Sequence, residues 1–288
     1  MMLWARRRRA EAPARNAAEI VPAALPLALD AGLFAQHFAQ LHETLAPLGG
    51  TERCLERLVA KQRLCGATLA SARERDIEAD AVARLLGYVF TARRHLLPAL
   101  DRLGAQQCAR LLRDLGDTEV PLVQRLQKFV DAMPGVRMPD DGDVRAAARV
   151  RRAAWDFAAE VVHYADPARF PLMSRWVWDS TTQSGALREF VRDNETMQQL
   201  PFDDSAELSA GARKWLAACI AEHGVNGSTP LWVDLVLAQA YASYVRSIAN
   251  GSLGGEFGRG AEPHEQLTKM LGIDTDKGRL RKPVMGNA

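Results

Sequence analysis

The chain has 288 residues, of which 48% are hydrophobic and 25% are charged, values that are typical of a globular protein with one large or two modest domains. No apolar run approaches the roughly 18 residues that a membrane span needs, so we expect no membrane association. The four cysteines form no C-x-x-C pair, which argues against a zinc framework or a secreted disulfide scaffold and predicts a cytoplasmic protein with reduced thiols.

The net charge of +2 is distributed unevenly along the chain. Residues 1–15 contain five arginines and one glutamate, and residues 277–288 contain four basic residues, so the body between them is net acidic. A folded nucleic-acid-binding protein usually carries its basic residues on the domain itself. The distribution therefore favours a protein partner and leaves the two basic ends as the candidate contacts to nucleic acid.

The N-terminal half is predicted to be helical after an initial arm. We expect residues 1–18 to form a disordered basic arm and residues 19–133 to form an antiparallel helical bundle with short loops. The expected helices run from about Asp30 to Ala46, from Thr51 through Leu69, from Ile77 to Leu97 before Pro98, from Leu103 to Leu115 and from Leu122 to Val130.

Residues 134–143 are rich in Pro, Gly and Asp, and they predict an exposed linker. A C-terminal helical region is expected over residues 144–276, followed by a basic tail over 277–288. Its expected helices run from Val144 to about Tyr164, from Leu172 to Ser180, from Ser184 to Gln199, from Ser205 to His223, from Thr229 to Ala249 and from Pro263 to Leu271. The sequence thus predicts an all-α, multi-helix bundle of about nine to ten helices, as one body or as two packed helical subdomains.

The segment from Trp155 to Trp178 is the most distinctive part of the chain, because it holds three of the six tryptophans around an Asp-Pro-Ala-Arg-Phe-Pro break at 166–171. One interpretation is a rigid corner between helices, in which Arg175 pairs with Asp179 four residues later. The other interpretation is a recognition surface, since Trp and Arg are favoured anchors of interfaces. The candidate binding residues are Arg169, Arg175, Trp176, Trp178, Asp179, Trp232 and Asp234.

Sequence motifs of catalysis and of metal binding are missing. The chain has no G-x-S-x-G element, no H-E-x-x-H pair, and neither G-x-x-x-x-G-K-[ST] nor G-x-G-x-x-G for a phosphate group. Glu160 and His163 form a single Glu-x-x-His pair, whereas helical di-iron sites use one such pair on each of two helices. We therefore predict no catalytic residue, no metal ligand and no cofactor. Asp234, on the most apolar predicted helix, is expected to bond to neighbouring helices, with a role in a pocket as the alternative.

Two short segments resemble known families. The run Met133-Pro134-Gly135-Val136-Arg137, followed by a helix and by ARFPLMSRWVW, resembles the hairpin region of the helix-hairpin-helix DNA glycosylases. That resemblance implies a nucleic-acid-associated ancestry without glycosylase activity, because Ser174 occupies the position of the family's catalytic aspartate. Separately, Glu262-Pro263-His264 looks like part of the acidic-Pro-Asp-His motif of all-helical chaperones that help redox enzymes to mature.

The leading hypothesis is a non-catalytic, cytoplasmic accessory or adaptor protein that binds a protein partner, for example in the assembly or maturation of an enzyme. The first alternative is a nucleic-acid-associated protein that uses its basic ends and the glycosylase-like region. The second alternative is an enzyme with a helical pocket around Trp176, Trp178, Trp232 and Asp234.

Overall fold

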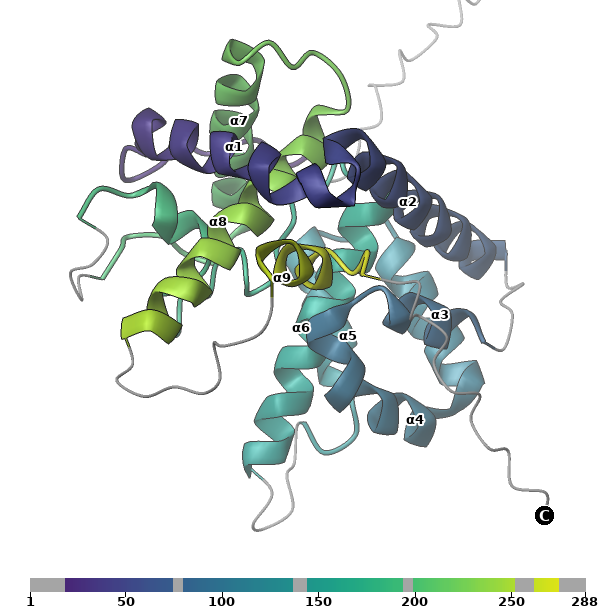
Figure 1. The fold of residues 1–288 in the computed structure, drawn as a ribbon. Helices are drawn as coiled ribbons and strands as arrows, with labels where there is room; N and C mark the ends of the chain where they lie inside the picture. The colour runs from purple at the N-terminus through teal and green to yellow at the C-terminus, as the bar shows by residue number, and fades with distance from the viewer. Residues whose placement is uncertain (1–18, 75–79, 137–143, 194–198, 252–261, 275–288) are drawn as a thin grey trace, which may run out of the picture.

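The computed structural model describes residues 19–74, 80–136, 144–193, 199–251 and 262–274 (Figure 1). These residues form nine α-helices and contain no β-strand, which confirms the predicted all-α, multi-helix fold. The helices are α1 (Ala31–Leu45), α2 (Gly50–Glu74), α3 (Ala81–Gly87), α4 (Phe90–Gly116), α5 (Leu122–Asp131), α6 (Val144–Ala165), α7 (Ala206–Glu222), α8 (Thr229–Gly251) and α9 (Pro263–Met270), with short 3-10 turns η1 (Ala46–Leu48) and η2 (Ala186–Phe190).

Helix α1 begins where the sequence predicts it. The Asp30 carboxylate accepts a hydrogen bond from the Leu33 amide at 2.9 Å, which satisfies one of the free donors of the first helical turn. Phe34 and Phe38 lie on its buried face, with ring centroids 5.6 Å apart. The spacing of apolar residues thus identifies the face of α1 that packs against α8 (Figure 1).

Two predicted boundaries in the N-terminal half differ from the structure. The third predicted helix is interrupted at Val89, between α3 and α4, and α4 then continues through Pro98, where we expected a stop. Leu96 and Ala99 beside that proline are fully buried, so packing holds this turn in helical form despite the missing amide donor. The break in α4 occurs at Gly104 instead, which has φ 74° and ψ 162°.

Helix α6 is central in the molecule, because it packs against α2, α4 and α5 (Figure 1). The rings of Phe129 on α5 and Phe157 on α6 stack with centroids 5.5 Å apart. One continuous cluster of buried side chains includes residues from both sides of the predicted linker. The division into parts 19–133 and 144–276 stays a prediction, and the arm 1–18, the linker residues 137–143 and the tail lie outside the described residues.

Helix α8 is strongly apolar, but α1 is slightly more apolar on average, so the prediction that α8 is the most apolar helix is wrong. Helix α8 packs against α1, α7 and α9. The structure describes no helix that combines the length and the apolar character needed to cross a membrane. Pro263 opens α9, and Gly272 ends it with φ 67°, which agrees with the predicted start and stop of this helix.

The segment that connects α6 to α7, residues 166–205, contradicts two predicted helices. Residues 172–180 are not helical, and within 184–193 the structure shows only the 3-10 turn η2. Side chains of α6 bond to this backbone: Trp155 donates its indole N–H to the Met173 carbonyl at 2.8 Å, and Asp156 accepts from the Arg175 amide at 2.9 Å. These bonds satisfy backbone groups that a helix would otherwise pair internally.

Candidate functional site

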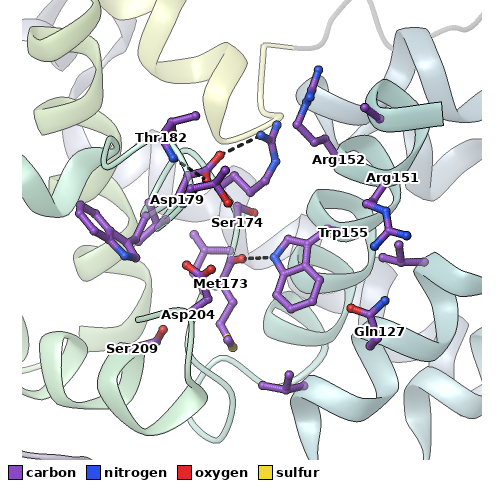
Figure 2. Close-up of a pocket in the computed structure, with 18 residues that line it drawn as sticks. Gln127, Arg151, Arg152, Trp155, Met173, Ser174, Asp179, Thr182, Asp204 and Ser209 are labelled. Atoms are coloured by element: carbon purple, nitrogen blue, oxygen red, sulfur yellow. Dashed lines mark hydrogen bonds and ion pairs between the residues drawn. The ribbon is translucent and has the colours of Figure 1, made fainter. Parts of the chain in front are cut away.

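An open cavity of about 520 Å³ lies between α5, α6 and the connecting segment (Figure 2). Three arginines and two tryptophans are among its lining residues, namely Arg151, Arg152, Arg175, Trp155 and Trp178. A pocket of this size, with apolar walls and a few polar groups, is typical of ligand and peptide sites in proteins. We call it the α5–α6 cavity.

The wall formed by α6 is basic. Arg151 and Arg152 are exposed, and neither makes a hydrogen bond or an ion pair within the described part of the chain. Figure 2 shows Arg151 on the same side of the cavity as Trp155 and Gln127. Burial lowers the pKa of nearby His95, and the positive charges of Arg94, Arg149 and Arg152 lower it further. This face of α6 is therefore basic, and the described residues show no ion pair to Arg151 or Arg152.

The opposite wall is organised around Arg175. Its guanidinium contacts the Asp179 carboxylate at 3.0 Å and the Asp156 carboxylate at 3.5 Å, so the pairing of Arg175 with Asp179 that the spacing predicts is confirmed. Asp179 also accepts hydrogen bonds from the amides of Thr181 and Thr182. This network fixes the turn that presents Trp178 and Thr182 to the cavity.

Asp156 lies beneath this wall and is almost fully buried. Burial raises the pKa of Asp156 to about 6, while the nearby Arg175 guanidinium opposes the rise. The charge that holds Arg175 in place thus depends on pH in a mildly acidic range.

A second acidic group borders the cavity where the connecting segment approaches α7. The Asp204 carboxylate accepts a hydrogen bond from the Ser180 amide at 3.1 Å and another from the Ser180 hydroxyl. Asp204 and Ser209 face the cavity across from Trp155 (Figure 2). Both lining carboxylates, Asp179 and Asp204, therefore already accept hydrogen bonds from the protein.

The structure distributes the seven predicted site residues over several places. Arg175, Trp178 and Asp179 line the α5–α6 cavity, but Trp176 points into the core, where its indole donates to Glu160 at 3.4 Å and its ring lies 5.9 Å from that of Tyr241.

The three remaining candidates are separate from this cavity. Trp232 packs against Phe38, with ring centroids 5.9 Å apart. Asp234 lies beside a buried void of about 20 Å³, and Arg169 lines another cavity, of about 240 Å³. The four residues proposed for an enzymatic pocket therefore do not converge on one cavity.

A buried ion pair beneath the site was not predicted. Lys61 and Glu160 are almost fully buried and lie 2.7 Å apart, and the Lys61 ammonium also donates to the Leu271 carbonyl at 2.9 Å. Ser174 donates to the same Glu160 carboxylate at 3.4 Å. The sequence signal was the spacing: Lys61 lies three residues after Leu58, on the buried face of α2.

Asp234 bonds to a neighbouring helix, as predicted. Its carboxylate lies 2.9 Å from Nε2 of His163, whose Nδ1 lies 2.8 Å from the Phe170 carbonyl. A carbonyl oxygen only accepts, so Nδ1 carries a proton, and the contact between Nε2 and the carboxylate needs a second one. His163 thus links the Asp234 carboxylate on α8 to the Phe170 carbonyl of the connecting segment.

Chemistry beyond binding has little support among the described residues. They contain no group of three or more His, Cys, Asp or Glu side chains placed to hold a metal ion. Cys65, close to the Lys61–Glu160 pair, is buried, and burial raises the pKa of its thiol to about 12, so it is not an activated nucleophile.

The basic wall of the cavity is the main feature that the sequence analysis missed. Four arginines lie between Arg145 and Arg152, and no acidic residue occurs from 144 to 155. This local excess of arginine indicates a basic helix face, but it is not visible in the net charge of the body of the chain, which is acidic.

No protein-family model, no curated protein and no solved structure matches this chain.

Proposed function

We propose that this protein binds a partner protein, and that the α5–α6 cavity receives a short segment of that partner which combines an apolar side chain with acidic residues. The observation that carries this proposal is the pairing of an open cavity of about 520 Å³ with two exposed arginines that have no ion-pair partner within the described ranges. An adaptor of this kind needs no catalytic group of its own.

The composition of the two walls supports this choice of occupant. Trp155 and Trp178 offer apolar surface at the cavity, and tryptophan is a frequent anchor of protein interfaces. Arg151 and Arg152 offer planar, charged donors that suit carboxylates. Asp179 and Asp204 already accept hydrogen bonds from the protein, so the basic wall is the part of the cavity available to an acidic segment.

The test selects peptides that bind the full-length protein from a displayed random library. We expect the selected peptides to combine Asp or Glu with an aromatic or aliphatic residue, and to change the tryptophan fluorescence when they bind. The double variant Arg151→Glu, Arg152→Glu should weaken their binding about tenfold or more, since like charges then face each other.

The matched control is Arg63→Glu with Arg110→Glu, which makes the same change of net charge at two exposed arginines that do not line the cavity. Peptide affinity in this control should stay close to that of the unchanged protein. Equal losses in both double variants, or peptides without acidic residues, would contradict the proposal.

A second candidate function, nucleic-acid binding, is favoured by a different observation. Arg145, Arg149 and Arg152 follow one another at four and three residues, so they lie along one exposed face of α6. A basic stripe of this kind suits a phosphate backbone, and the basic ends of the chain would add to it.

Salt dependence tests this second candidate. If it is correct, DNA or RNA is retarded in a gel at low salt, and the affinity falls steeply as salt is added, because bound counterions are released. The double variant Arg145→Glu, Arg149→Glu, or deletion of residues 1–15 and 277–288, should reduce this slope. Arg145 and Arg149 do not line the α5–α6 cavity. The Arg145→Glu, Arg149→Glu variant should therefore still bind the selected peptides. Absence of retardation at low salt removes this candidate.

A further inference from the structure

A second cavity, of about 240 Å³, lies at the other end of α6, where α2, α4 and the start of the connecting segment meet. Three of its lining residues are arginines from three different elements, namely Arg73, Arg125 and Arg169, whereas Asp166 is its one lining carboxylate among the described residues. On the same measure a single water needs only about 10–15 Å³, so this cavity has room for a larger guest. We call it the arginine cavity.

Arg125 is the most informative of the three. Its side chain is almost completely buried, it donates from Nη1 to the Leu115 carbonyl at 2.7 Å, and its buried Nε has no hydrogen-bond partner. Burial and the positive charges of Arg169 and Arg73 lower the pKa of Arg125 to about 10, against an opposing effect of Asp117, so the guanidinium is still charged at neutral pH. A buried cation with an unsatisfied donor is costly unless an anion or another acceptor reaches it.

Some of the guanidinium N–H donors of Arg73 and Arg125 already bond to backbone carbonyls of the protein. Arg73 donates to the Gly116 carbonyl, so Arg73 and Arg125 both cap the C-terminal end of α4. The guanidiniums of Arg125 and Arg169 lie 4.8 Å and 5.2 Å from the centroid of the Phe170 ring, so two positive charges are close to the same ring. A guanidinium has five N–H donors, so capping one carbonyl leaves donors for a guest.

We propose that the arginine cavity binds a phosphate group. Three guanidiniums present more donors than the two oxygens of a carboxylate accept, and their combined charge suits a phosphate that carries more than one negative charge. Thr118 also lines the cavity, and a threonine hydroxyl is a possible further donor. This site is separate from the α5–α6 cavity, since the two have no lining residue in common.

The test measures binding of inorganic phosphate and of O-phosphoserine to the full-length protein by titration calorimetry at constant ionic strength, with acetate as the carboxylate comparison. We expect a phosphate probe to bind at least about tenfold more tightly than acetate. Binding of either phosphate probe supports the proposal, and the tighter of the two identifies whether a free or an esterified phosphate is preferred.

Three variants assign the binding to this cavity. Arg73→Gln and Arg169→Gln should each weaken phosphate binding about tenfold, because each removes charge-assisted donors. The control is Arg113→Gln: Arg113 also bonds to a helix-end carbonyl, that of Ala72 at 2.9 Å, but does not line the cavity, so this variant should retain full affinity. Circular dichroism checks that all three remain folded.

Three results would overturn the proposal: no measurable binding of either phosphate probe, acetate binding as tightly as phosphate, or equal loss of affinity in Arg113→Gln and in the two cavity variants. The peptide experiment on Arg151 and Arg152 probes the α5–α6 cavity and does not depend on phosphate binding. A negative result at one cavity therefore does not contradict the proposal for the other.

Discussion

At the scale of single residues, Asp156 is a buried carboxylate that positions a residue of the candidate site. Its carboxylate accepts the Arg175 amide and contacts the Arg175 guanidinium, so it positions one wall of the α5–α6 cavity although it is itself almost fully buried. Burial nevertheless raises the pKa of Asp156, which means that the native state binds a proton more tightly than the unfolded chain does. Ionisation of this residue is therefore tolerated at a cost to stability.

The raised pKa gives a prediction with a definite sign. Between pH 3.8 and about 6 the unfolded chain has lost this proton and the native state still holds it, so the free energy of unfolding should fall as pH rises through this window. Relative to Asp156→Asn, the unchanged protein should lose up to about 3 kcal/mol between pH 4 and pH 7. Urea unfolding at several pH values measures this difference.

Asp203 provides a control of opposite sign. Hydrogen bonds from the Ser205 hydroxyl and amide lower the pKa of Asp203, so its contribution to stability is present at neutral pH and is lost as pH falls through the lowered pKa. The difference between Asp203→Asn and the unchanged protein should therefore change with pH in the other direction. The same pH trend in both comparisons would contradict the assignment for Asp156.

At the scale of elements, the end of α9 is a junction that the helix pattern alone does not reveal. The Leu271 carbonyl accepts a hydrogen bond from the buried Lys61 ammonium. The next residue, Gly272, has φ 67°, and a Cβ added to it would overlap the Tyr88 carbonyl. The close approach holds α9 against the loop between α3 and α4. Gly272 is thus required both by its backbone conformation and by the space around it.

These two requirements can be separated by mutation. Gly224 also has a positive φ, of 84°, but a Cβ there would meet no atom within 4 Å, so Gly224→Ala should cost only the backbone strain of about 1–2 kcal/mol. Gly272→Ala adds the steric overlap and should reduce the free energy of unfolding by clearly more. Chemical denaturation of both variants tests this, and equal losses would show that the contact with Tyr88 relaxes freely.

At the scale of the whole molecule, α6 organises the fold and both candidate sites. Its N-terminal half contributes Arg151, Arg152 and Trp155 to the α5–α6 cavity, and its last turn borders the arginine cavity. Between them, Glu160 pairs with Lys61 of α2 in the core. Removing one partner of such a buried pair typically costs about 3–5 kcal/mol, so the pair ties α2 and α6 together beneath both sites.

The fold class, most helix positions and some local pairs can be predicted from the order of the amino acids alone. The stripe that includes Phe34 and Phe38, the Thr229-Pro230 start of α8, and the pair Arg175–Asp179 are all local patterns with a period or a spacing along the chain, and the structure contains each of them. Such features depend on neighbours a few residues away, which a sequence displays directly.

Which of these residues contact one another depends on long-range packing. The segment 172–180 is not helical, and Trp155 and Asp156, on another element, bond to its backbone. Trp176 packs against Tyr241, and the buried Trp178, two residues later, packs against Phe202 at the edge of the α5–α6 cavity. Likewise, nothing in local spacing indicates that Arg125 lies beside Arg73 and Arg169. These contacts join residues far apart in the chain, so their energies depend on packing, which the order of amino acids specifies only through the complete fold.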